Sequence, residues 1–227
     1  MLGRMRFRGD IQTFEDEGFL RRVAQDSAAA FVIGLGATLV FGIVLAMFAP
    51  GLFDGLLSGI FAADGRGFID YVLWIAWVAV ATAVSFIAHE LVHGIFFKAF
   101  APAGARVTFG ANWKRGMLYA STEGVIYTRA QYLVIALAPT FVVTAALIAA
   151  GFACGCPVAG AFAATLHLSG CAGDWEYVRE IAADPLITHC EDTASGVRFF
   201  GADDAGDEAA GDEPAAPGAD AHGEVRP

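Results

Sequence analysis

The chain has 227 residues, of which 56% are hydrophobic, and its mean hydropathy is +0.56. This composition is too apolar for an ordinary soluble domain and favours a polytopic membrane protein. The formal net charge is −10, but after Phe200 eight acidic residues stand against Arg226 alone, so the rest of the chain is nearly balanced. No basic surface is implied, and we expect no nucleic-acid partner.

The predicted fold is mainly α: a helical bundle in the membrane, with a small β-hairpin insert and a disordered acidic C-terminal tail. Residues 1–27 mix arginines with acids and are interpreted as a cytoplasmic N-terminal segment. A membrane domain is expected over 28–181. It holds about four spans, at about 28–48, 69–97, 132–152 and 158–177, each apolar enough to cross a bilayer.

The stretch between the second and third spans breaks the helical pattern. Aromatic and β-branched residues flank a polar turn over about 105–122, which predicts a β-hairpin. Its edge could hold an extended substrate through main-chain hydrogen bonds, although a plain connection explains the same pattern. Pro139, within the third span, frees a backbone carbonyl, so it either kinks the helix or opens a path for water.

The last part of the chain, 182–227, is polar and becomes acidic and rich in Ala, Gly and Pro from Gly201 onward. We predict a disordered tail there. Arginine and lysine are concentrated before the first span, in the loop after the second and beyond the fourth. The positive-inside rule then predicts a multi-pass protein of the cell membrane with both termini in the cytoplasm.

Residues 89–93, inside the second predicted span, read H-E-L-V-H. On a helix, His89 and His93 lie one turn apart on one face, so both imidazoles can bind one Zn²⁺. Glu90 can then act as the base that takes a proton from a zinc-bound water. A chance match on an ordinary helix face is the alternative, but ionisable groups within a span are costly and usually functional.

A catalytic zinc site takes three protein ligands, and Asp174 is the candidate for the third. It lies five residues before Arg179, and His93 lies five before Lys98, so both are expected at similar depth near the cytoplasmic face. A helix-end carboxylate in interfacial water is the alternative for Asp174. His167 is a candidate second-shell residue, bonding the zinc-bound water or substrate; a buried histidine bonded to a neighbouring helix is the alternative.

The cysteines at 154, 156, 171 and 190 contain no C-x-x-C pair. Small buried residues in apolar helices explain them, and a soft-metal site or a loop disulfide is the alternative.

The stretch from about Gly67 to Glu180 resembles a family of small membrane zincin peptidases, distant relatives of the site-2-protease intramembrane metalloproteases. The resemblance rests on the H-E-x-x-H motif within a span, the strand-like insert, the segment that ends at Pro139, and Gly173-Asp174. It implies His89, His93 and Asp174 as metal ligands and Glu90 as the catalytic base. The Asn-Pro that site-2 proteases carry before the ligand aspartate is absent, and His167 lies in that region instead.

The sequence therefore predicts an integral membrane zinc metallopeptidase acting on peptides in or next to the lipid bilayer. One alternative is a zinc transporter or sensor, in which the same ligands bind Zn²⁺ and Glu90 is dispensable. Another is an inactive zincin scaffold that serves as a structural membrane subunit.

Overall fold

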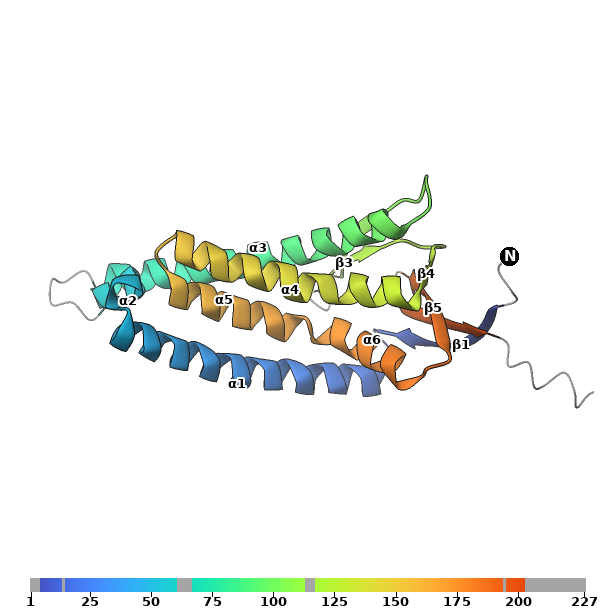
Figure 1. Ribbon diagram of the computed structural model, residues 1–227, viewed down its shortest axis with the longest axis horizontal. Helices are drawn as coiled ribbons and strands as arrows, with labels where there is room; N and C mark the ends of the chain where they lie inside the picture. Colours follow the sequence, from blue (N-terminus) through green and yellow to red (C-terminus); the bar gives the residue numbers. More distant parts are fainter. Residues whose placement is uncertain (1–4, 14, 61–66, 113–116, 194, 203–227) are drawn as a thin grey trace, which may run out of the picture.

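The structure is a computed structural model that describes residues 5–13, 15–60, 67–112, 117–193 and 195–202. Long helices lie side by side along the molecule, and the strands gather at one end (Figure 1). The helices are α1 (Glu17–Phe48), the short 3-10 helix η1 (Pro50–Leu52), α2 (Gly55–Ile60), α3 (Gly67–Phe100), α4 (Arg129–Ala153), α5 (Pro157–Gly170) and α6 (Ala172–Ala183). The strands are β1 (Met5–Gln12), β2 (Thr108–Asn112), β3 (Met117–Ser121), β4 (Ile126–Thr128), β5 (Ile187–Thr193) and β6 (Gly196–Ala202).

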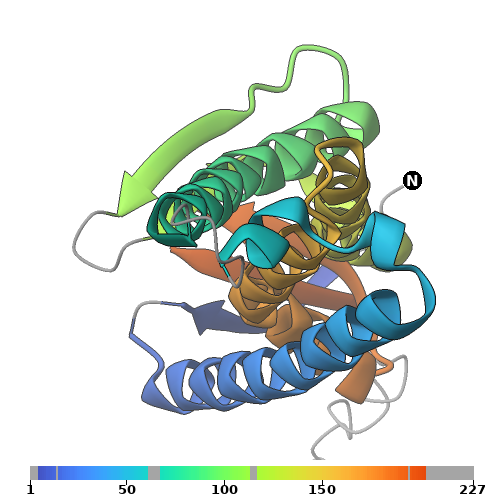
Figure 2. The ribbon, with the colours of Figure 1, turned by 90° about the vertical axis from the view of Figure 1, so that its left-hand side faces the viewer.

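Helix α5 packs against α1, α3 and α4, as the view along the bundle in Figure 2 shows. Small residues allow these close approaches. A Cβ added at Gly160 would lie 2.7 Å from the Cα of Gly151 on α4, and one added at Gly34 on α1 would lie 2.6 Å from Thr165. Without a strong hydrophobic force between helices in lipid, close packing of this kind is what holds a bundle together.

Three of the described helices, α1, α3 and α4, are long and apolar enough to cross a membrane. Large apolar side chains on them face outward: Ile33 on α1 is 72% exposed and Ile95 on α3 is 64% exposed. Such a surface is costly in water and is matched by lipid chains. The helices reach beyond the predicted spans, because α1 begins at Glu17, within the predicted N-terminal segment.

The predicted fourth span, 158–177, is not a single helix. Helix α5 ends at Gly170, and after Cys171 the chain continues as α6. Helix α6 is polar, since it contains Glu176, Arg179 and Glu180. At 1.5 Å per residue, the 14 residues of α5 extend about 21 Å, which is shorter than the hydrocarbon core of a bilayer. The expectation of four spans is therefore corrected to three candidate spans.

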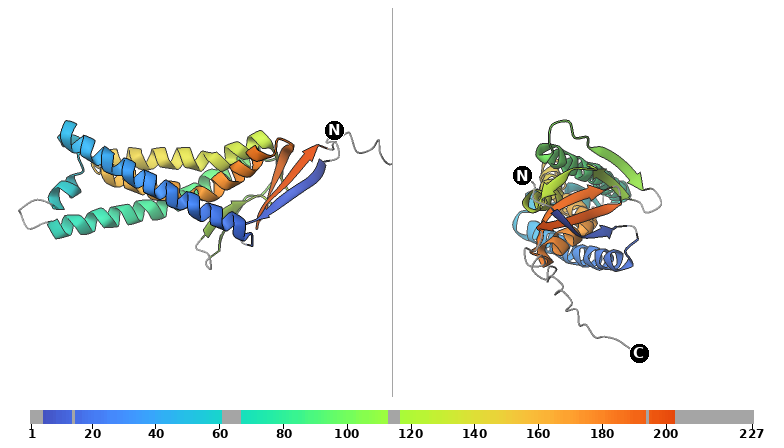
Figure 3. Two further views of the ribbon diagram at one scale, coloured as in Figure 1. Left: turned by 90° about the horizontal axis from the view of Figure 1, so that it is seen from below. Right: turned by 90° about the vertical axis from the view of Figure 1, so that its right-hand side faces the viewer.

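The prediction of disorder over 182–227 is wrong for 182–193 and 195–202, and residues 194 and 203–227 lie outside the described part. Strands β5 and β6 join β1 and β4 in an antiparallel sheet of order β1-β6-β5-β4 (Figure 3). Ile187, Cys190, Val197 and Phe199 turn into a core that also receives Phe19 and Tyr127. Polar composition concealed this alternation, because only one face of each strand is buried.

The hairpin predicted over 105–122 is present as the antiparallel pair of β2 and β3, and residues 113–116 between them lie outside the described residues. It lies against α3. Gly94 permits the contact, because a Cβ there would lie 2.5 Å from the ring of Phe109. The glycine after the H-E-x-x-H motif thus sets how closely β2 and β3 approach the motif.

Helix α6 is fastened to the polar first turns of α1. Arg22 Nε lies 2.7 Å from Oε2 of Glu176, whose side chain is only 2% exposed. Arg179 pairs with the same carboxylate and with Asp26. These ion pairs hold the start of α6, and with it Asp174, against the bundle at the end where the apolar part of α1 gives way to charged residues.

Candidate metal centre

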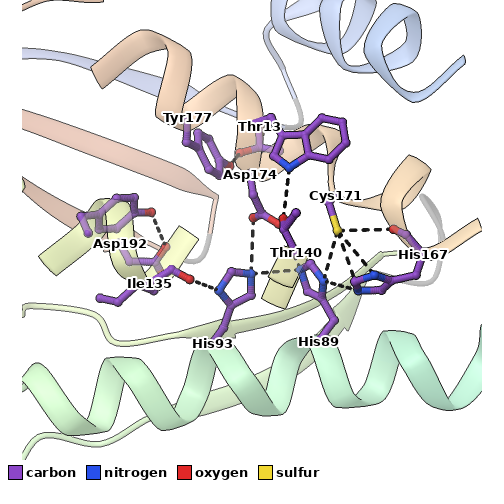
Figure 4. A network of polar contacts seen from close by, with 12 residues as sticks. Thr13, His89, His93, Ile135, Thr140, His167, Cys171, Asp174, Tyr177 and Asp192 are labelled. Atoms are coloured by element: carbon purple, nitrogen blue, oxygen red, sulfur yellow. Dashed lines mark hydrogen bonds and ion pairs between the residues drawn. The ribbon is translucent and has the colours of Figure 1, made fainter. Parts of the chain in front are cut away.

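Three predicted ligands, two on α3 and one on α6, meet at one point (Figure 4). Nε2 of His89 and Nε2 of His93 are 3.0 Å apart. The carboxylate of Asp174, in the first turn of α6, lies 3.1 Å from His89 Nε2 and 3.4 Å from His93 Nε2. The expectation that His93 and Asp174 lie at similar depth is confirmed by these distances.

The other nitrogen of His93 has a fixed partner. Nδ1 lies 3.0 Å from the carbonyl oxygen of Ile135 on α4. A carbonyl can only accept, so Nδ1 carries the proton and Nε2 presents its lone pair toward His89 and Asp174. Ile135 is four residues before Pro139, which has no N–H to bond that carbonyl within the helix. The carbonyl that Pro139 frees is therefore the one that orients His93.

His89 is oriented by hydrogen bonds that run through His167 to Thr144. Its Nδ1 lies 3.2 Å from Nε2 of His167, and Nδ1 of His167 lies 3.2 Å from the hydroxyl of Thr144. When Nδ1 of His89 donates to His167, Nε2 of His89 is left free to bind a metal. His167 is fully buried. The structure thus places His167 behind a candidate ligand, on the side away from Asp174.

The donor set suits zinc. Two imidazole nitrogens and a carboxylate oxygen are common ligands of catalytic Zn²⁺, and three protein ligands leave a coordination position for water or substrate. The Ile135 and His167 contacts meet the further requirement that the nitrogen not bound to metal is hydrogen-bonded. The residues present therefore fit a zinc ion.

A cavity of about 170 Å³ opens onto this centre. Glu90, His89, His93 and Asp174 line it together with residues of β3. The backbone N–H of Ala120 on β3 donates to the Glu90 carboxylate. The side chain predicted to act as a base therefore lies beside the candidate ligands, with the hairpin along one wall.

Asp192 on β5 adds a second carboxylate to the cavity wall. Its Oδ1 accepts a hydrogen bond of 3.2 Å from the hydroxyl of Tyr132. Burial raises the pKa of Asp192 to about 7, despite the hydrogen bond from Tyr132, which acts in the opposite direction. Near neutral pH this group therefore exchanges its proton, unlike an ordinary aspartate.

The sequence indicated most of this site but not all of it. All five predicted residues, 89, 90, 93, 167 and 174, lie together, although His167 contacts His89 rather than the cavity. Asp192, which comes from the segment expected to be disordered, was missed, and Cys171 was considered only as one of four cysteines, with a soft-metal site as the alternative. A signal for Cys171 existed, because His167 and Cys171 are four residues apart, the same spacing that pairs His89 with His93.

Residues 82–186 match the model of a protein family described as "Putative zincin peptidase". The match begins inside α3 and ends just after α6, so it contains the three candidate ligands, Glu90 and His167, whereas α1, β1, β5 and β6 lie outside it. No curated protein and no solved structure matches the chain. The family expected from the sequence is thus confirmed for this stretch, and the relation to site-2 proteases stays a prediction.

Proposed function

We propose that this chain is an integral membrane zinc metallopeptidase that hydrolyses peptide bonds within or next to the membrane. The observation that carries the proposal is the convergence of His89, His93 and Asp174 from separate helices, with Glu90 in the same cavity. The match to a zincin peptidase family supports the same reaction class. The ligands are His89, His93 and Asp174, and Glu90 is the base.

Each residue has a distinct part in the reaction. A zinc ion bound at this centre supplies an activated water and a polarised substrate carbonyl. Glu90 accepts the proton of the attacking water and passes it to the leaving nitrogen. The Ala120 N–H keeps the Glu90 carboxylate facing the cavity. Ile135 and His167 keep both imidazoles in the tautomer that can bind metal.

An extended substrate fits beside β3. Leu118, Tyr119 and Ala120 line the cavity, and among the described strands only β2 pairs with β3. The other edge of β3 can therefore bond the main chain of a peptide and hold its scissile amide near the centre. The apolar surfaces of α1, α3 and α4 favour substrates that lie in or near the bilayer.

Zinc content of the purified protein in detergent tests the metal centre. We expect about one zinc ion per chain in the parent, and a lower zinc affinity in His93→Ala and in Asp174→Ala, because each variant loses one of three ligands. Glu90→Gln should keep the ion, because Glu90 is not a ligand. A folded parent without zinc would exclude the proposal.

Hydrolysis is tested with detergent-solubilised membrane proteins as the substrate pool. New peptide termini detected by mass spectrometry should form with the parent and be absent with Glu90→Gln, although both hold zinc. Equal cleavage by parent and Glu90→Gln would exclude Glu90 as the base. Zinc binding without cleavage by either protein would favour the transporter or sensor alternative.

A further inference from the structure

A second group of metal-binding side chains lies directly behind the candidate centre. It consists of His89, His167 and Cys171, and one ligand atom from each lies within 4.8 Å of the others. Cys171 and His167 are both fully buried. His89 belongs to both groups, since it presents Nε2 to Asp174 and Nδ1 to His167 (Figure 4).

The distances in this group fit a metal ion. His89 Nδ1 lies 3.2 Å from His167 Nε2, and Cys171 Sγ lies 3.8 Å from each of these nitrogens. A point equidistant from three atoms so placed is about 2 Å from each, close to the bond lengths of zinc to imidazole nitrogen and thiolate. Two imidazoles and a thiolate favour a thiophilic ion.

The neighbours of His167 leave one of its ring nitrogens free to bind a metal ion. The Thr144 hydroxyl lies 3.2 Å from Nδ1 of His167, so that nitrogen can donate and Nε2 keeps its lone pair toward His89 and Cys171. Gly170, next to Cys171, lines the same cavity as His89, so the backbone beside the second group borders that cavity.

We propose that His89, His167 and Cys171 form a second site for a thiophilic ion such as Zn²⁺ or Cd²⁺, and that this site competes with the first for His89. A neutral imidazole has one lone-pair nitrogen, so binding through Nδ1 leaves the proton on Nε2, which then cannot bind at the first centre. Cys171 binds as thiolate and releases its proton to solvent. The competition rests on the proposed function of the first centre, whereas binding at Cys171 does not.

A purely structural role for Cys171 is the alternative that the variants must separate from metal binding. Its thiol donates to the carbonyl of His167, 3.3 Å away, where α5 ends. Cys171→Ser keeps a donor at this position but is a poor ligand for a soft ion. The matched control is Cys190→Ser, because Cys190 is also fully buried but lies on β5, outside both groups.

The test uses the full chain in detergent, with Co²⁺ as the probe. The protein is a double variant, His93→Ala with Asp174→Ala, which removes two ligands of the first centre and none of the second. We expect the near-ultraviolet absorption of a thiolate–cobalt bond in this variant. Adding Cys171→Ser should abolish the band, and adding Cys190→Ser should leave it. A folded double variant without the band would overturn the second site.

Stoichiometry tests the competition. About one Co²⁺ per chain is expected in the parent, because a neutral His89 can bind only one ion. Two bound ions together with the thiolate band would overturn the proposed competition. If the double variant does not fold, X-ray absorption of the Cd²⁺-loaded parent tests the second site instead. A sulfur ligand to the metal is expected in the parent, and it should be absent in Cys171→Ser. Failure of the proposed function would appear separately: in Cys171→Ser, which lacks the second site, adding His93→Ala or Asp174→Ala would leave the metal content unchanged.

Discussion

At the scale of single residues, the centre depends on giving each imidazole nitrogen one defined partner. His93 uses a carbonyl that an ordinary helix would have kept for itself, and His89 uses a histidine that is in turn bonded to a threonine. Buried polar groups without partners are costly, so these contacts stabilise the fold and also decide which nitrogen can bind metal. A proline in mid-helix, usually a cost, here contributes to the site.

Pro139→Ala tests this role. The new N–H at 139 can bond the carbonyl of Ile135, which competes with the bond from His93. We expect zinc affinity to fall about tenfold, while α4 becomes more stable because a missing helix bond is restored. Competition with a chelator measures affinity, and thermal unfolding in detergent measures stability. Pro157→Ala, at the first turn of α5, is the control and should leave zinc affinity unchanged. Unchanged affinity in Pro139→Ala would contradict the assignment.

Asp192 gives a pH dependence of known sign. Its pKa is raised from 3.8 to about 7 in the folded protein, so its contribution to stability is present below about pH 4 and is lost as pH rises through about 7. The melting temperature of the parent should therefore fall more between about pH 5 and about pH 8 than that of Asp192→Asn, whose amide does not titrate. Asp10→Asn, on the exposed face of β1, should behave like the parent. Identical profiles for parent and Asp192→Asn would refute the shift.

At the scale of elements, the site on α3 is completed by two pieces, α6 and the hairpin of β2 and β3, that are neither long nor strongly apolar. Helix α6 brings Asp174 and is held by ion pairs to α1, and the hairpin brings the Ala120 N–H to Glu90. Both depend on close contacts rather than on length. Their positions are therefore sensitive to single added atoms.

Gly94→Ala tests the seat of the hairpin. The added Cβ would lie 2.5 Å from the ring of Phe109, so β2 and β3 must move away from α3. We expect zinc content to be retained but release of new peptide termini to fall roughly tenfold or more, because the substrate edge is displaced. On α1, Gly36→Ala meets nothing within 4 Å and should keep full activity, with a stability gain of about 1 kcal/mol at most. Loss of zinc in Gly94→Ala would show that the hairpin supports the ligands instead.

At the scale of the whole molecule, the strands and α6, which carries Asp174, lie toward one end, and the turn between α4 and α5 lies toward the other (Figure 1). Charged residues on α6 and the first turns of α1 accompany the centre, whereas the apolar surface covers the middle of the bundle. A membrane around that middle part would place the centre near one interface, where water can reach it.

Cys154 reports on the orientation. It is exposed between α4 and α5, whereas the other three cysteines are buried. With the N-terminus in the cytoplasm, as the arginine distribution predicts, crossings by α1, α3 and α4 place Cys154 on the outer side of the membrane, where it should react with a membrane-impermeant maleimide added to intact cells. Cys154→Ser should abolish labelling. Labelling that requires broken cells would mean that the orientation is reversed.

The sequence by itself determined the parts whose signal is local. A long apolar run indicates a membrane helix wherever it packs, and H-E-x-x-H places two imidazoles on one helix face by geometry alone. Hence α1, α3, α4, the hairpin and the pairing of His89 with His93 were predictable. Asp174 was predicted from its expected depth in the membrane and from the family resemblance, and in the structure its carboxylate contacts both histidines.

Only the tertiary structure decided what depends on contacts between distant segments. The break at Cys171 ends the predicted fourth span, because α6 finds its partners in the charges of α1. Strands β5 and β6 are stable because β1 and β4 pair with them, although their composition reads as polar. The use of the Ile135 carbonyl by His93, and the meeting of Cys171 with His89, require helices that only folding brings together. Local patterns thus set the elements, and long-range contacts set the chemistry available to them.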